Sequence, residues 1–392
     1  MARAIRSKSY KPSEIAILHV ICKASRHLFL FEDNVDPLKS YGHRRDWIID
    51  RMLHLCSYMA IDVLNFSLLG NHMHHILRSR PDIVAKWSDR EVVRRWLTLC
   101  PARRIKTDVD GKTVYQPLPP RDIDIDRVLK NPARVAKIRS QLSDISWFMR
   151  LLKQYIAQRA NKEDGKALGH FWCGRFKAIR IEDELHLIAC ALYVDLNPIR
   201  AAMAQSLEEY DYTSARVRLE RLRRMRNASE KDPAAHSPPD PIPTAEGTAS
   251  SDSKPIALTE QSPAPRKEKT FVERCAFLSA LRMETLSSDV EESKTGFRCS
   301  DKGFLTMSDK EYLDLLQWCV ENKITDKDSE PPAELPKPLE SHRGHINALW
   351  GLVKNFSRLV KHTAGAEAKD CLAWHRQETA EVSETGGENQ TA

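Results

Sequence analysis

The residues best suited to chemistry lie in the stretch "LLGNHMHHIL", residues 68–77, where three histidines fall within four positions of an apolar run. Side chains alternate between the two faces of a β-strand, so we expect His72 and His74 on one face and His75 on the other. Two imidazoles on one strand face can chelate a divalent cation, but H-x-H also occurs among ordinary strand residues. A metal site here needs a third ligand from another part of the chain.

A second candidate lies in residues 182–203, which have the pattern of an amphipathic helix with an acidic start. Tyr193 and Asn197 are four residues apart and are therefore neighbours on its surface. A phenol can act as a covalent nucleophile, and an amide oxygen is a ligand that hard cations accept. Tyr193 also suits a core position, and Asn197, before Pro198, suits the N-cap of a following helix. The residues alone leave both interpretations open.

These residues need a scaffold, and the order of the expected elements predicts one. Residues 15–31, 62–81 and 168–181 have strand composition, the second as a hairpin around Gly70–Asn71. Helical spacing occurs in 41–61, 85–99, 126–161, with a break at Pro132, and 182–203. The polar, proline-rich stretch 101–124 indicates a loop. This alternation predicts an α+β fold, a mainly antiparallel sheet with helices packed on it.

The composition divides the 392 residues into four parts. We expect a main domain over 10–227 with an apparent insertion at about 80–140, and a Ser- and Pro-rich disordered linker over 228–268. A smaller, mostly helical region of unknown role follows over 269–365, and 366–392 form a disordered tail. Nine cysteines without a C-x-x-C pair indicate reduced thiols in a cytoplasmic protein. We see no signal peptide and no apolar run that could span a membrane.

Taken together, "SLLGNHMHHIL", "GHFWCGRFKAIRIEDELHLIACALYVDLNPIRAAMA" and "YDYTSARVR" resemble the single-tyrosine HUH transposases, especially the group of REP-associated tyrosine transposases. The resemblance covers roughly residues 10–217, and "GRF" leading into "YVDLNPIRA" is its specific part. The chain departs from the family at Gly70, where proline is frequent, in the stretch 80–140, and in its last 150 or so residues, which match nothing we can assign.

The resemblance implies a ferredoxin-like HUH nuclease core that cleaves and rejoins single-stranded or hairpin DNA in transposition. Mg²⁺ or Mn²⁺ would be bound by His72, His74 and Asn197 and would polarise the scissile phosphate. Tyr193 would attack phosphorus, leaving a 5′-phosphotyrosine and a free 3′-hydroxyl that can be rejoined without ATP. A homodimer, in which the tyrosine helix serves the partner's metal, is compatible with this family.

Basic residues near these segments are candidates for DNA binding, in keeping with the net charge of +7. Arg175 and Lys177 lie on an expected strand, with aromatic residues nearby for base stacking. An arginine-rich helix follows, with Arg216, Arg218, Arg221, Arg223, Arg224 and Arg226. Arginine-rich helices are also commonly just solvated faces, and aromatic residues are commonly core residues, so both interpretations stay open.

Two other functions compete with a transposase. One is a catalytically silent DNA-binding descendant of the same fold, against which the joint presence of His72, His74 and Tyr193 argues. The other is a structural protein whose histidine cluster holds zinc, for which a cysteine near the cluster would be expected and is missing. Tyr155 is the second candidate for the nucleophile, although its helix offers no counterpart to Asn197.

Overall fold

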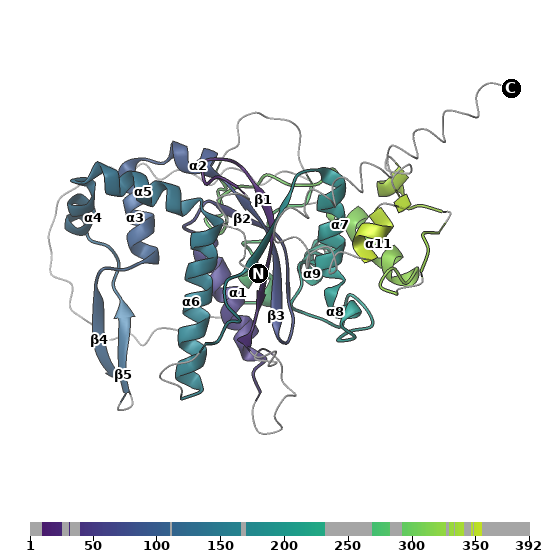
Figure 1. Ribbon diagram of the computed structural model, residues 1–392, viewed down its shortest axis with the longest axis horizontal. Coiled ribbons are helices and arrows are strands. Elements are labelled where there is room, and N and C mark those ends of the chain that lie inside the picture. The colour runs from purple at the N-terminus through teal and green to yellow at the C-terminus, as the bar shows by residue number, and fades with distance from the viewer. Residues whose placement is uncertain are drawn as a thin grey trace.

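The computed structural model describes residues 10–25, 31, 40–109, 112–165, 170–231, 269–282, 292–326, 329–332, 334–340, 346–347 and 349–354. At its centre is a four-stranded antiparallel sheet with the strand order β2-β3-β1-β6 (Figure 1). Its strands are β1 (Ile17–Lys23), β2 (Ile61–Leu68), β3 (His72–Ser79) and β6 (Lys177–Ile181). β2 and β3 form a hairpin, in which the Leu69 N–H donates to the His72 carbonyl at 2.9 Å.

Helices cover both faces of this sheet. α1 (His43–Cys56) and α6 (Ile145–Glu163) pack on one face, and α7 (Glu184–Asp195) packs on the other (Figure 1). The short α8 (Asn197–Arg200), α9 (Ser214–Lys231) and α11 (Asp309–Glu321) lie on the same side as α7. The strands alternate accordingly, because Leu18 and Val20 join the core beneath α1 and α6, whereas Ile21 and Ile76 join the core beneath α7.

The C-terminal region packs directly on this sheet. It contains α10 (Phe271–Arg274) and α11, and Leu278 forms a parallel bridge to Val63 on the outer edge of β2. The Arg78 guanidinium donates to the carbonyls of Lys302 and Gly303 at 2.6 and 2.9 Å. The outer edge of β2 is therefore covered, as the exposed edge of a sheet needs to be.

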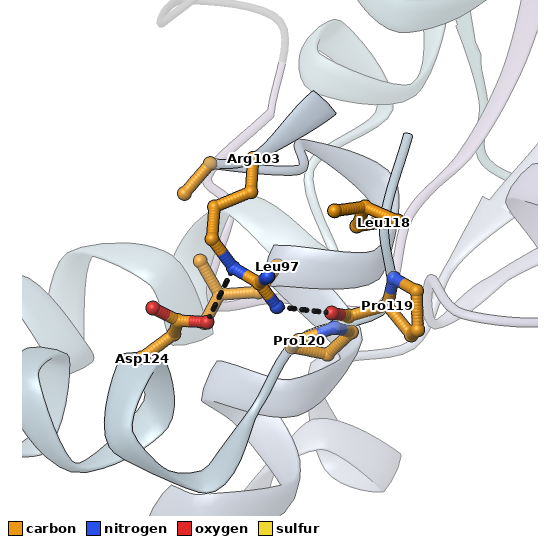
Figure 2. Close-up of a pocket in the computed structure, with 7 residues that line it drawn as sticks. Leu97, Arg103, Leu118, Pro119, Pro120 and Asp124 are labelled. Carbon is orange, nitrogen blue, oxygen red and sulfur yellow. Dashed lines mark hydrogen bonds and ion pairs between the residues drawn. The ribbon is translucent and has the colours of Figure 1, made fainter. Parts of the chain in front are cut away.

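Six elements that lie between β3 and α6 make up the apparent insertion, at the end of the molecule opposite α11 (Figure 1). They are α2 (Pro81–Lys86), α3 (Asp89–Leu99), β4 (Arg104–Val109), β5 (Lys112–Pro117), α4 (Asp122–Leu129) and α5 (Pro132–Leu142). Figure 2 shows Arg103 joining the β4–β5 hairpin to α4, with its guanidinium 2.9 Å from both the Asp124 carboxylate and the Pro119 carbonyl. The cavity there, about 10 Å³, holds about one water molecule and no larger ligand.

The α+β fold with an antiparallel sheet and the hairpin at Gly70–Asn71 are confirmed. The prediction of a loop over 101–124 is wrong, because β4, β5 and the start of α4 lie there. The helical stretch 126–161 is broken twice, at Pro132 and again before Ile145, where the Asp144 carboxylate accepts a bond from the Ser146 N–H at 2.7 Å and caps α6.

Residues 232–268, which make up most of the predicted linker, and the predicted tail 366–392 lie outside the described residues. Within the described ranges, no helix combines the length and the apolar character needed to cross a bilayer.

Candidate active site

The histidines of β3 divide between the two faces of the sheet as predicted. His74 and His72 share a face with Ile76, which packs beneath α7, and their ring centroids are 5.0 Å apart. His75 points to the opposite face of the sheet, as do Met73 and Leu77, which lie two residues before and after it on β3 and belong to the core on that face. His75 is fully buried, and neither of its ring nitrogens has a hydrogen-bond partner within the described residues.

The structure brings Tyr193 to these histidines. Its ring centroid lies 5.6 Å from that of His74, with the two rings edge to face, although 119 residues separate them. α7 carries Tyr193 over the sheet and is capped by the preceding Asp183, whose carboxylate accepts a bond from the His186 N–H at 2.8 Å. Tyr193 is only 4% exposed, so the candidate nucleophile lies inside the protein.

A third histidine belongs to the same cluster. His19 on β1 has its Nε2 atom 2.9 Å from His74 Nδ1, and its ring lies 6.1 Å from that of Tyr193. β1 pairs with β3 so that Ile21 lies opposite His74 and His19 lies opposite Ile76, which sets the two imidazoles on a diagonal. We did not predict His19, because a single histidine in an apolar strand gives no signal until the pairing of the strands is known.

Asn197, the third ligand implied by the family resemblance, lies on α8 and not on the helix that carries Tyr193. It is the first residue of α8, it is buried, and its Nδ2 atom has no hydrogen-bond partner within the described residues. Within the described residues, no hydrogen bond joins Asn197 to His72 or His74. Three residues further along α8, the Arg200 guanidinium lies 5.4 Å from the centre of the Tyr193 ring and donates to the Val353 and Lys354 carbonyls at 3.0 and 3.1 Å.

Burial keeps the imidazoles of the cluster uncharged. Loss of solvent lowers the pKa of His72 to about 4, with a smaller effect of the Lys23 ammonium, and lowers the pKa of His19 to about 3. For His74 the pKa lies well below its usual range, because the ring is buried and its neighbours are other histidines. A neutral imidazole is the form that binds a metal ion.

The free ring atoms of His72 and His74 fit a cation. His72 Nδ1 lies 2.6 Å from Asn71 Oδ1, and His74 Nδ1 is bonded to His19, which leaves the Nε2 atom of each ring for another partner. His74 Nε2 is buried and has no hydrogen-bond partner within the described residues. In the same ranges, no group of three or more His, Cys, Asp or Glu side chains is arranged to hold a metal ion. The structure thus offers two metal-competent imidazoles without a third ligand in place.

A buried carboxylate fixes the helix that carries Tyr193. Asp195 accepts bonds from the Ser214 hydroxyl at 2.6 Å, the Tyr312 hydroxyl at 2.7 Å and the Asn65 amide at 2.7 Å. Burial raises the pKa of Asp195, an effect that these bonds oppose. The network ties α7 to β2, α9 and α11, so the C-terminal region helps to hold the tyrosine helix against the sheet.

The residues predicted to bind DNA fall into two groups. Arg175 and Arg224 are exposed, and Lys177 is half-buried on β6. Arg216 and Arg223 each form an ion pair with Glu220 on α9. For Arg218 and Arg221 the prediction does not fit, because both are turned into the protein. Arg218 is fully buried and paired with Asp309 at 2.9 Å, and Arg221 donates to the Cys275 carbonyl at 3.0 Å.

The positions of Tyr155 and of the aromatic residues Phe171 and Phe176 bear on two further predictions. Tyr155 lies on α6, across the sheet from His72 and His74, and its hydroxyl accepts a bond from Arg159. The aromatic rings of Phe171 and Phe176, expected near the DNA, are buried in the protein.

Comparisons with known proteins add little to this description. No family model matches the chain, and no curated protein matches it. A solved structure of the REP-associated tyrosine transposase bound to a REP hairpin aligns with 55% of this chain and 82% of its own, at 13% identity and a TM-score of 0.30. A similarity of that size does not establish a shared activity.

Proposed function

We propose that this chain is a DNA strand-transferring nuclease of the transposase type, with Tyr193 as its nucleophile and Mg²⁺ or Mn²⁺ bound through His72 and His74. The observation that carries the proposal is the contact between Tyr193 and His74 on one face of the sheet. A phenol beside the neutral imidazole of His74, whose ring in turn neighbours that of His72, has the parts needed for covalent attack on a phosphodiester.

The metal ion would draw charge from the phosphate oxygens and make phosphorus more susceptible to attack. The Tyr193 hydroxyl oxygen bonds to phosphorus while the bond from phosphorus to the 3′-oxygen breaks, and the departing oxygen takes up the proton that the phenol loses. A free 3′-hydroxyl then attacks the phosphotyrosine, rejoins the strand and returns the proton to Tyr193. Asn197 would complete the ligand set after a shift of α8.

A second candidate function is DNA binding without cleavage. It is favoured by the burial of Tyr193, whose hydroxyl group DNA could not reach without a change in the structure. Under the first proposal Tyr193 must gain exposure when DNA binds, whereas under the second it stays in the core.

The formation of a covalent adduct separates the two. We expect the protein with Mn²⁺ to retain label from a pool of labelled single-stranded hairpins with randomised stems on a denaturing gel. Tyr193→Phe should abolish this band, and Tyr155→Phe should leave it intact because Tyr155 lies across the sheet. A Tyr193→Phe protein that still forms the adduct would refute the nucleophile, and binding of the pool without any adduct would support the second candidate.

A further inference from the structure

We propose that His19 is a positioning residue that accepts a hydrogen bond from His74 Nδ1 when a cation binds, and so holds His74 in the tautomer whose Nε2 atom carries a free electron pair. The inference rests on the proposed function in one respect, the presence of a metal ion at this cluster. Its structural basis is the 2.9 Å contact between His19 Nε2 and His74 Nδ1.

A neutral imidazole carries one N–H, so this contact has two arrangements. If His19 donates, His74 must carry its own proton on Nε2, where the buried N–H has no acceptor within the described residues. Such a donor costs about 1–3 kcal/mol. If His74 donates from Nδ1, His74 Nε2 is left with its electron pair. In the second arrangement His19 carries its proton on Nδ1, which is buried as well, so the burial of an N–H does not decide between the two. A bound cation decides, because it needs the electron pair that only the second arrangement leaves on His74 Nε2.

His72 shows the same arrangement with a different partner. Its Nδ1 atom lies 2.6 Å from the Asn71 side-chain oxygen, which can only accept, so the proton is on Nδ1 and Nε2 is free. Both imidazoles therefore turn the same atom to the site, as metal-binding histidines do when the second ring nitrogen donates to a neighbour. β1 holds His19 rigidly for this role, because it is hydrogen-bonded to β3 and β6 on its two sides.

The tautomer can be read in the Mg²⁺-loaded protein without DNA, since Mg²⁺ is diamagnetic. In histidine-labelled protein, long-range ¹H–¹⁵N spectra should show His74 protonated at Nδ1. His19→Leu should lose this preference and bind Mn²⁺ about 10–100-fold more weakly. In His19→Gln, the side-chain oxygen can accept from Nδ1 and should restore both properties.

A Mg²⁺-loaded wild-type protein with His74 protonated at Nε2 would overturn the inference, as would a folded His19→Leu protein with unchanged Mn²⁺ affinity. If the leucine variant does not fold, the wild-type spectrum still decides. A wild-type protein that binds neither Mg²⁺ nor Mn²⁺ would count against the metal in the proposed function, whereas a bound cation beside an Nε2-protonated His74 would count against the role of His19 alone.

An independent observation points to a second surface. We propose that Arg127, Lys130, Arg134 and Lys137 bind the phosphate backbone of duplex DNA that flanks the cleaved strand, which also rests on the proposed function. These four residues, called here the basic surface, are exposed on α4, the α4–α5 connection and α5. None of them has an ion pair within the described residues.

The charge of the region explains why they are free. Residues 80–142 contain fifteen Lys and Arg against eight Asp and Glu, a net charge of +7 that equals that of the whole chain. The acidic side chains of α4 are already paired, Asp122 and Asp126 with Arg90 and Asp124 with Arg103, and Asp89 at the start of α3 is paired with Arg139. The basic surface therefore keeps its full positive charge for an external polyanion.

The side-chain chemistry and the position of the basic surface favour duplex DNA over a single strand as its ligand. No aromatic side chain lies on α4 or α5 to stack with the bases of a single strand. α4 and α5 also lie at the far end of the molecule from α7 (Figure 1), so DNA that reaches both must extend beyond the cleaved strand.

The test uses hairpins with duplex flanks of increasing length and the Tyr193→Phe protein, so that cleavage does not interfere. Changing the four basic residues to Gln should lower the slope of log affinity against log salt by about 3–4 on the long flanks, since each phosphate contact contributes about 0.9. The matched control changes the exposed Lys294, Lys302, Lys310 and Lys337 to Gln and should leave the slope unchanged. Equal losses in both variants would refute the surface, and a larger loss on RNA duplexes would assign it to RNA instead.

Discussion

The hydroxyl of Tyr312 offers a direct measure of how firmly the C-terminal region holds the tyrosine helix. It is fully buried and donates to the Asp195 carboxylate at 2.7 Å, while the Asn65 amide lies 3.1 Å from it. Tyr312→Phe removes one hydrogen bond to a charged group, which contributes about 1.5–3 kcal/mol. Asn65 keeps its bond to Asp195, so little further loss is expected. We therefore expect a loss of about 2–3 kcal/mol in the free energy of unfolding.

Thermal and urea unfolding followed by two probes would measure this loss. A change of that size should lower the Tm by about 4–12 °C. Because Tyr312 belongs to α11 and Asp195 to α7, both parts should unfold in one transition. The matched control is Tyr155→Phe, which removes a hydroxyl from the half-buried surface of α6 and should cost less than about 1 kcal/mol. Unchanged stability of the Tyr312→Phe protein, or a separate C-terminal transition already present in the wild-type protein, would show that the network does not couple the two parts.

Three other substitutions test single contacts. Burial lowers the pKa of His54 to about 4, so the unfolded chain takes up a proton before the folded protein does as the pH falls below 6.5. The wild-type protein should therefore lose more free energy of unfolding between pH 7 and pH 5 than His54→Gln does, by about 1 kcal/mol. His75→Leu removes two buried nitrogen atoms without partners and should raise the free energy of unfolding by about 1 kcal/mol, a gain that a hidden hydrogen bond would reverse. Arg218→Met should cost about 3–5 kcal/mol in urea unfolding, and Arg224→Met less than about 0.5; equal losses would contradict the burial of Arg218.

The sequence could predict those features of the site that depend on local geometry. The period of a β-strand separates His72 and His74 from His75 without any knowledge of the fold. The single helix expected over 182–203 is divided in the structure, with Tyr193 on α7 and Asn197 on α8. His19 could not be found in this way, since its part in the site depends on the register of β1 against β3. The same holds for Tyr312, which reaches Asp195 across 117 residues. Contacts of this kind follow from tertiary packing and leave no periodic signal in the chain.

Arg218 shows how a composition can mislead. In "SARVRLERLRRMR" the arginines have the density of a phosphate-binding helix, but α9 packs against β2 and α11 and turns part of its arginine-rich face inward. The carbonyls of Leu64 and Ser279 and the carboxylate of Asp309 then take up the guanidinium of Arg218. The charge of Arg218 therefore helps to attach the C-terminal region to the sheet. The exposed basic side chains of α4 and α5 are the better candidates for DNA binding.

The burial of Tyr193 and the position of Arg200 have a common consequence for the proposed reaction. Arg200 lies over the Tyr193 ring and donates to the carbonyls of Val353 and Lys354, so it attaches α8 to the C-terminal region beside the candidate nucleophile. α8 also carries Asn197, so under the proposed function a shift of this one short helix would have to uncover the phenol and bring the Asn197 amide oxygen to the histidines. Such a shift would break the two hydrogen bonds of Arg200, whereas the bonds of Asp195 belong to α7 and would hold that helix against the sheet.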